Sequence, residues 1–434
     1  MDAATLTKLL SPEGWALLGA LPPYDEKQSL VLAAGLRAKG VDPDLAAAAL
    51  TQSRLRAAAR GKLGAFADGM LFTQAGLEQA SRLVVAGLHA RRFLDAGVRR
   101  VADLTSGIGV DALAFAAADL EVLATDVDEL TAAIATVNLR HFPEAEVRLG
   151  DGLALDLEGE RIDGVYADPA RRTRSGSRVF DPKAYAPPLD AVWALRERVP
   201  AVGIKVGPGI SHDGLPDDAE TEWVSVDGDV VEAGLWFGPL APEGPGRTAL
   251  VLATTPVPDG DGGTTTRTSS RRLAHRPGDE DVVPEVGAVG QYLYEPDGAV
   301  IRAGLVAHAA RDLGGRLLDR TIAYVTTDSP ARLDEAGLAE GLARGYRVLD
   351  VMPFGLKRLR TYLRERGVGR LTIKKRGTAV TPEQLRRQLS LSGDATATIV
   401  LTRVGGSQQV LVVEPLDTSR RTAGPGDARQ DDAR

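Results

Sequence analysis

Four aspartates between residues 100 and 170 each stand at the end of a short apolar run or just beyond it. Asp103 and Asp126 end the first two runs, Asp151 follows the third, and Asp168 ends the fourth. If consecutive runs are parallel strands, their carboxyl ends meet at one edge of the sheet, so these carboxylates are expected to share a ligand site. A single aspartate also fits a helix cap or a turn, but the ordered set favours a site.

A glycine-containing turn follows the first of these carboxylates. Gly107 and Gly109 come shortly after Asp103, and an apolar helix is expected to begin at Val110. Glycines let a ligand approach the backbone, and a helix N-terminus offers unpaired N–H groups. The spacing Gly-x-Gly-x-x-Ala also fits a dinucleotide fingerprint, so a Rossmann-type NAD(P)-dependent oxidoreductase is one alternative. However, Asp103 would stand where the pyrophosphate has to lie, and it suits a ligand with a cationic ammonium group.

The elements that must position these residues are alternating strands and helices. Strands are expected at residues 101–104, 122–125, 147–149, 165–167 and 202–206, with helices after the first two. This alternation predicts a parallel sheet built of βα units. Apolar runs at 230–237 and 248–253 have no helix between them, which predicts an antiparallel hairpin that closes the sheet.

Residues 1–90 are expected to form a helical N-terminal domain. Asp44 is predicted to cap a helix that ends near Arg60. A second apolar series at helical spacing comprises Leu77, Ala80, Val84 and Leu88. The segment between the two helices is rich in aromatic residues, and packing within a small helical domain is its simplest interpretation.

The remainder of the chain divides into a linker, a third domain and a tail. The core that carries the aspartates is assigned to residues 91–255, and the polar, glycine-rich residues 256–286 predict a linker. An α+β domain is expected over residues 287–416, with a strand near 291–294, a helix over 301–313, and later strands and helices up to 414. Residues 417–434 are expected to be a disordered tail.

The charge of the 434-residue chain is unevenly distributed. The net charge is -7, yet residues 344–403 hold 14 Lys and Arg against 4 Asp and Glu, which leaves -17 on the rest. On the helix expected over 356–366, Lys357, Arg360 and Arg364 share one face, and the strand after it ends in a basic cluster, Lys374, Lys375 and Arg376. These six residues are predicted to bind phosphates of a nucleic-acid substrate, with a solvated charged surface as the alternative.

Several functional classes are excluded by composition. The chain has no cysteine, which rules out disulfides, thiolate metal sites and cysteine nucleophiles. Its 5 histidines have no metal-ligand spacing, so no metal is expected. The N-terminus has no export signal and no apolar run is long enough for a membrane span, so a cytoplasmic protein is expected. The oligomeric state is left open.

The ordered acidic strand ends resemble those of class I S-adenosylmethionine-dependent methyltransferases, over about residues 95–255. The resemblance implies a Rossmann-like core with S-adenosylmethionine as cofactor. Its methionine part would be held by Asp103, Thr105, Gly107 and Gly109, its ribose by Asp126 and its adenine by Asp151.

Over most of its length, the chain is similar to bacterial methyltransferases that carry a THUMP-like C-terminal domain. The similarity rests on the helical preface, the core and the sequence Ile-Lys-Lys-Arg-Gly at 373–377. In these proteins the N-terminal aromatic loop would fold over the cofactor, which adds Phe66 and Thr73 as candidate cofactor contacts. The implied fold is α/β, with an N-terminal helical domain and a C-terminal α+β THUMP-like domain.

Asp168 and Pro169 stand where amino-methylating enzymes of nucleic acids carry Asp/Asn-Pro-Pro-aromatic. In those enzymes the acidic side chain and a carbonyl group accept hydrogen bonds from an exocyclic amine. This chain has Ala170 and Arg171 in the last two places, and an arginine can stack on a base or hold a phosphate. Asp168, Pro169 and Arg171 are therefore predicted to be catalytic, in direct methyl transfer to structured RNA. A non-catalytic nucleic-acid-binding protein with a degenerate core is the remaining alternative.

Overall fold

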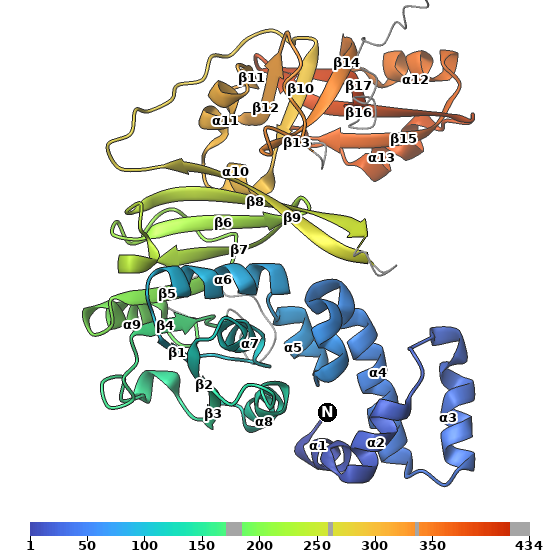
Figure 1. The fold of residues 1–434 in the computed structure, drawn as a ribbon. Helices are drawn as coiled ribbons and strands as arrows, with labels where there is room; N and C mark the ends of the chain where they lie inside the picture. The colour runs from blue at the N-terminus through green and yellow to red at the C-terminus, as the bar shows by residue number, and fades with distance from the viewer. Residues whose placement is uncertain (171–184, 259–263, 335–337, 417–434) are drawn as a thin grey trace, which may run out of the picture. The chain divides into compact units, whose positions relative to one another are not determined.

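A computed structural model describes residues 1–170, 185–258, 264–334 and 338–416 (Figure 1). The chain forms two compact units. Unit 1 comprises Met1–Val206 with Leu235–Gly244, and unit 2 comprises Gly207–Gly234 with Pro245–Arg434. The expected boundary at residue 90 does not coincide with this division, because residues on both sides of it belong to unit 1.

Unit 1 begins with helices. They are α1 (Ala3–Leu10), α2 (Pro12–Ala20), α3 (Ser29–Ala38), α4 (Pro43–Leu63), α5 (Gln74–Gln79) and α6 (Leu83–Asp95), with 3₁₀ turns η1 (Glu26–Gln28) and η2 (Gly64–Gly69). The predicted cap of α4 was wrong by two residues. Asp42 accepts the N–H of Leu45 at 2.9 Å, and Asp44 lies in the first turn. Pro43 explains the shift, because its fixed φ and missing N–H suit the first helical position, which makes Asp42 the cap.

The predicted continuous helix through Leu77 and Leu88 was also wrong. The chain leaves α5 after Gln79 and begins α6 at Leu83, so the apolar series is divided between two helices. In α6 it is Val85, Ala86, His89, Ala90 and Phe93 that are buried, whereas Leu88 is 37% exposed.

The sheet of unit 1 contains the predicted parallel strands. Its elements are β1 (Arg100–Asp103), α7 (Val110–Ala117), β2 (Glu121–Asp126), α8 (Glu129–Asn138), β3 (Ala145–Leu149), η3 (Gly152–Ala154), β4 (Gly164–Ala167), α9 (Leu189–Trp193), η5 (Ala194–Glu197), β5 (Ala201–Val206) and η6 (Gly238–Leu240). The strand order is β3-β2-β1-β4-β5, and all four pairings are parallel. The carboxyl ends of β1, β2 and β4 therefore lie at one edge.

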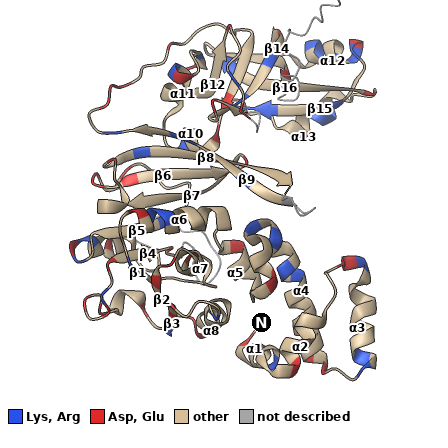
Figure 2. Ribbon diagram, viewed as in Figure 1, with Lys and Arg blue, Asp and Glu red and all other residues tan. Residues whose placement is uncertain are grey.

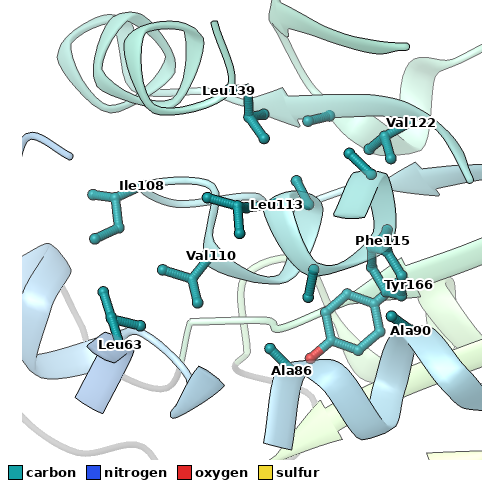
Figure 3. Close-up of a cluster of buried hydrophobic side chains, with 14 of the residues drawn as sticks. Leu63, Ala86, Ala90, Ile108, Val110, Leu113, Phe115, Val122, Leu139 and Tyr166 are labelled. Carbon is teal, nitrogen blue, oxygen red and sulfur yellow. The ribbon is translucent and has the colours of Figure 1, made fainter. Parts of the chain in front are cut away.

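One hydrophobic core joins the N-terminal helices to this sheet. Leu63 of α4 and Ala86 of α6 lie beside Val110 and Phe115 of α7, and Tyr166 of β4 completes the cluster (Figure 3). The N-terminal helices thus bury one flank of the helix that follows the glycine turn. Burial of this apolar surface stabilises the turn together with the helices.

A buried asparagine fastens the N-terminal segment to the glycine turn. Asn138 at the end of α8 donates from Nδ2 to the carbonyls of Leu71 (3.1 Å) and Ile108 (2.8 Å), and its Oδ1 accepts the N–H of Leu71 at 2.7 Å. Gln52 of α4 makes a similar pair of hydrogen bonds with the backbone of Phe72. Ile108 lies between the two glycines, so the position of this turn depends on contacts with residues 70–73.

Unit 2 begins with β6 (Glu220–Val226), most of β7 (Asp229–Trp236), β8 (Gly246–Pro258) and β9 (Thr264–His275), which are neighbours in the order β7-β6-β8-β9. The predicted hairpin of 230–237 with 248–253 was wrong, because β6 lies between β7 and β8 and pairs with β8 in parallel. The linker expected over 256–286 contains β9, which pairs with β8 antiparallel. β9 is an edge strand whose polar, β-branched residues face solvent, so it lacks the apolar pattern of a buried strand.

The rest of unit 2 is an α+β structure. Its elements are β10 (Tyr292–Pro296), α10 (Gly298–Arg302), α11 (Val306–Asp312), β11 (Arg316–Asp319), β12 (Ile322–Thr327), β13 (Leu338–Ala339), β14 (Ala343–Pro353), α12 (Leu356–Glu365), β15 (Val368–Lys375), α13 (Pro382–Leu389), β16 (Ala395–Val404) and β17 (Ser407–Pro415). The strand order is β11-β12-β10-β14-β17-β16-β15, and β13 pairs with β14. The helix expected over 301–313 is two helices, because Gly304 between them adopts a left-handed φ of 71°. The tail at 417–434 lies outside the described residues.

The Asn138 contacts generate a stability prediction. Asn138→Ala should lower the free energy of unfolding by about 1–3 kcal/mol, because the N–H of Leu71 and two buried carbonyls lose their partner. Denaturant unfolding measures the change. Thr136→Ala is the matched control, because Thr136 lies on the same helix but its hydroxyl donates to the carbonyl of Ala132 within that helix. Equal effects of the two substitutions would contradict this assignment.

Candidate active site

Asp103 is the most deeply buried of the predicted site carboxylates. Its side chain is 1% exposed, its Oδ1 accepts the N–H of Thr105 at 3.2 Å, and its Oδ2 has no hydrogen-bond partner among the described residues. Burial, followed by the negative charge of Asp111, raises the pKa of Asp103 well above its ordinary value. A buried carboxylate oxygen without a partner would be stabilised by a cationic ligand group.

The glycine turn is attached to the carboxylate that ends β2. Asp126 accepts the N–H of Gly107 at 3.1 Å through Oδ2 and the N–H of Asp128 at 2.9 Å through Oδ1. Gly107 and Gly109 have φ values of 55° and 84°, which side-chain-bearing residues rarely adopt. A Cβ at Gly107 would meet no atom within 4 Å, so the backbone there borders open space that a ligand can enter.

Thr105 joins the predicted cofactor residues to the predicted catalytic residues. Its hydroxyl accepts the N–H of Asp168 at 2.6 Å, which ties the loop after β1 to the loop after β4. Asp168 is partly exposed and Pro169 is buried beneath it. Arg171 lies outside the described residues.

The other predicted cofactor residues occupy more peripheral positions. Asp151 is exposed and caps η3 by accepting the N–H of Leu153 at 3.0 Å. Thr73 caps α5 by accepting the N–H of Gly76. Gly76 packs closely against Ile108 of the glycine turn, since a Cβ at Gly76 would lie 2.5 Å from Ile108 Cγ2. Phe66 lies in η2 and is 43% exposed. The cofactor contacts of these three residues stay predictions.

A group of buried polar side chains next to Asp168 was not predicted. It comprises Ser81, His89, Asp111, Tyr166 and Lys205. Lys205 Nζ lies 2.7 Å from Asp168 Oδ2 and 3.1 Å from Ser81 Oγ. A sequence signal existed for Lys205, because it is the one charged residue in the apolar run 202–206. The remaining members come from segments far apart in the sequence, and only the fold brings them together.

The six predicted substrate-binding residues of unit 2 divide into three pairs. Lys374 and Arg376 both contact Glu295, at 2.6 and 3.3 Å, and lie beside buried tyrosines. Arg360 and Arg364 donate to the carbonyls of Gln388 and Ser390 at the end of α13.

Lys357 and Lys375 are exposed. In Figure 2, α12 and β15 carry ribbon segments in the colour of Lys and Arg. The charge predicted from the sequence is therefore only partly directed to solvent.

Two searches of the described residues bear on the function. No group of three or more His, Cys, Asp or Glu in these ranges is arranged to hold a metal ion. No helix that the structure describes is both long enough and apolar enough to cross a membrane.

Comparison with known proteins identifies the family. The chain is 34% identical to an uncharacterised S-adenosylmethionine-dependent methyltransferase of Mycobacterium tuberculosis, over 81% of this chain and 91% of the relative. The chain belongs to the S-adenosylmethionine-dependent methyltransferases. The NAD(P)-dependent oxidoreductase alternative is thereby overturned.

Further comparisons agree with this assignment. The methyltransferase matches the "THUMP domain-like" family model at residues 343–415 and a domain of unknown function (DUF8688) at residues 2–59. Its fold is similar to a crystal structure of a provisionally named methyltransferase from Porphyromonas gingivalis W83, with a TM-score of 0.66 and 21% identity over 90% of this chain and 99% of that one. The predicted fold class is confirmed.

The site of the methyltransferase fits its cofactor. S-adenosylmethionine carries an ammonium group and a sulfonium centre, and Asp103 offers a buried carboxylate oxygen without a protein partner. The open space beside Gly107 leaves room for a ligand at the glycine turn. The cofactor contacts of Asp103 and the glycine turn stay predictions.

The role of Asp103 can be tested by calorimetric titration with S-adenosylmethionine. Asp103→Asn should weaken binding about 10- to 100-fold, because a neutral amide cannot balance an ammonium group. Wild-type affinity should also fall as the pH falls through the raised pKa of Asp103, since the cation binds the ionised form, and the variant should lack this dependence. Asp119→Asn, at an exposed turn, is the control. A variant that retains both the affinity and the pH dependence would refute the assignment.

Proposed function

We propose that this methyltransferase methylates structured RNA, with Asp168 and Pro169 positioning the nucleophile and a basic surface of unit 2 holding the RNA. The observation that carries the RNA assignment is the segregation of charge. Residues 344–403 carry a net charge of +10 in a chain whose total is -7. Phosphate backbones are recognised by such clusters, and this segment coincides with the THUMP-like match at 343–415.

The basic surface consists of exposed residues. It comprises Lys357, Arg358, Arg364, Arg370, Lys375, Arg386 and Arg387. Leu359 and Leu363 bury the opposite face of α12, and Leu385 and Leu389 do the same for α13. Each helix thus presents its basic residues outward over an apolar inner face, which favours contact with an extended polyanion.

The proposed chemistry at Asp168 is acceptance of a hydrogen bond and then a proton. S-adenosylmethionine supplies an electrophilic methyl group when it is bound. Asp168, whose backbone N–H donates to the Thr105 hydroxyl in the loop after β1, would accept a hydrogen bond from the attacking group of the substrate through its carboxylate and take up the proton as the new bond forms. The protein contributes orientation and exclusion of water.

Nucleoside mass spectrometry tests the function. Total RNA from cells that lack the gene should lack one methylated nucleoside, and the purified protein with S-adenosylmethionine should restore it. Asp168→Asn should lower the rate of restoration about 100-fold or more, because an amide cannot accept the proton. Asp190→Asn, at an exposed position in α9, should leave the rate unchanged. Identical nucleoside profiles with and without the gene would instead favour a non-catalytic RNA-binding protein.

The basic surface is tested by the dependence of RNA affinity on salt. Lys357→Glu combined with Lys375→Glu should weaken binding to bulk RNA and reduce the slope of log K against log salt by on the order of one unit per lost phosphate contact. Fluorescence anisotropy at several salt concentrations measures both quantities. Lys27→Glu, on an exposed turn of unit 1, is the control. If both variants lose affinity equally, the attraction is nonspecific and the surface is not the RNA site.

A further inference from the structure

Lys205 is a nearly buried lysine at the carboxyl end of β5, with 11% of its side chain exposed. Its Nζ lies 2.7 Å from Asp168 Oδ2 and 3.1 Å from the hydroxyl of Ser81. Burying an ammonium group is costly unless it is paired and hydrogen-bonded. The carboxylate that Lys205 contacts is the one to which the proposed function assigns the proton transfer.

A chain of buried polar contacts continues from Ser81, the second hydrogen-bond partner of Lys205. Ser81 Oγ donates to Asp111 Oδ2 at 2.7 Å, and Asp111 Oδ1 lies 2.9 Å from His89 Nδ1. The hydroxyl of Tyr166 lies 3.2 Å from the same histidine nitrogen. These residues lie before and within α6, in α7 and in β4. The ammonium is therefore fixed by several elements, which limits its movement.

Lys205 is connected to two carboxylates. It contacts Asp168 directly, and Ser81 links it to Asp111. Burial opposes ionisation of Asp111, but His89 and then the charge of Lys205 lower the pKa of Asp111, so it stays ionised. The pKa of Asp103 is raised by burial, then by the charge of Asp111, and also by the charges of Asp168 and Asp126.

Two further cations face the same region. Desolvation, followed by repulsion from Lys205 and then Arg82, lowers the pKa of Lys62 to about 8. Lys62 donates to the carbonyls of Leu77 and Glu78 at 2.8 and 3.0 Å, whereas Lys205 contacts the Asp168 carboxylate directly.

We propose that Lys205 is a positioning residue of the methyl-transfer site. Its ammonium anchors one oxygen of Asp168 and holds this side chain as an ionised acceptor, in the orientation that the nucleophile requires. Ser81 and Asp111 fix the ammonium in turn. The inference rests on the proposed role of Asp168. It adds that methyl transfer requires Lys205, which follows neither from the acidic strand ends nor from the family assignment.

The kinetic test compares Lys205→Met and Lys205→Arg, with RNA from cells lacking the gene and labelled S-adenosylmethionine as substrates. Lys205→Met should lower kcat about 100-fold with the KM for the cofactor nearly unchanged, and it should move the acidic limb of the kcat profile to higher pH. The limb moves in this direction because a carboxylate that loses the Lys205 cation keeps its proton to higher pH. Lys205→Arg should restore most of kcat and the position of the limb. Lys39→Met, at an exposed position of unit 1, is the matched control.

A measurement independent of activity is the unfolding of Lys205→Met, Asp168→Asn and the double variant. At pH 7 the double variant should have a higher Tm than the sum of the two single losses predicts, because each substitution by itself abolishes the contact between Lys205 and Asp168, and this contact can be lost only once.

The outcomes separate the two proposals. If the wild-type protein transfers no methyl group to RNA, the proposed function fails, and the unfolding cycle still decides whether Lys205 and Asp168 act as a pair. Additive Tm changes at pH 7 would overturn the inference. So would a Lys205→Met enzyme whose acidic limb stays where it is in the wild type.

Discussion

The crowding of negative charge at one edge of the unit 1 sheet is the constraint on which the rest of the site depends. Burial raises the pKa of Asp103, and the charges of Asp111, Asp168 and Asp126 each raise it further. The fold balances most of them with protein groups: His89 contacts Asp111, Lys205 contacts Asp168, and two backbone N–H groups donate to Asp126.

Among the buried side-chain atoms of the described residues that have no hydrogen-bond partner, Asp103 Oδ2 is the only carboxylate oxygen. We propose that a ligand that brings positive charge completes the environment of this oxygen. The cofactor of this methyltransferase family carries such a charge, which connects the electrostatics of the site to the identity of its ligand.

The N-terminal helices are part of this arrangement. They share the hydrophobic core of α7, and Asn138 bonds both Leu71 and Ile108, so contacts with the N-terminal segment hold the glycine turn. Residues with left-handed φ values, such as Gly107 and Gly109, gain conformational entropy when they unfold. Contacts with residues 70–73 offset this gain in entropy and keep the glycine turn in one conformation.

Much of the site and fold could be predicted from local patterns. Alternating apolar runs predicted β1 to β5, and the acidic residues at their ends predicted Asp103, Asp126 and Asp168 at one edge. These predictions depend only on strand periodicity and on the rule that parallel strands end together. The strand β9 was missed because an exposed edge strand needs no apolar pattern. The position of β6 between β7 and β8 was missed because the order of strands in a sheet does not follow from their order in the sequence.

The sequence by itself determined which side chains the chain could bring to the carboxyl ends of its strands and how much charge residues 344–403 carry. Only the tertiary structure decided how those charges are used. It pairs Lys374 and Arg376 with Glu295 and leaves Lys357 and Lys375 exposed. It also places Lys205 on Asp168, although 37 residues separate them. The reason is physical: burial and partner distance set the effective charge of an ionisable group, and both depend on contacts between segments distant in the sequence.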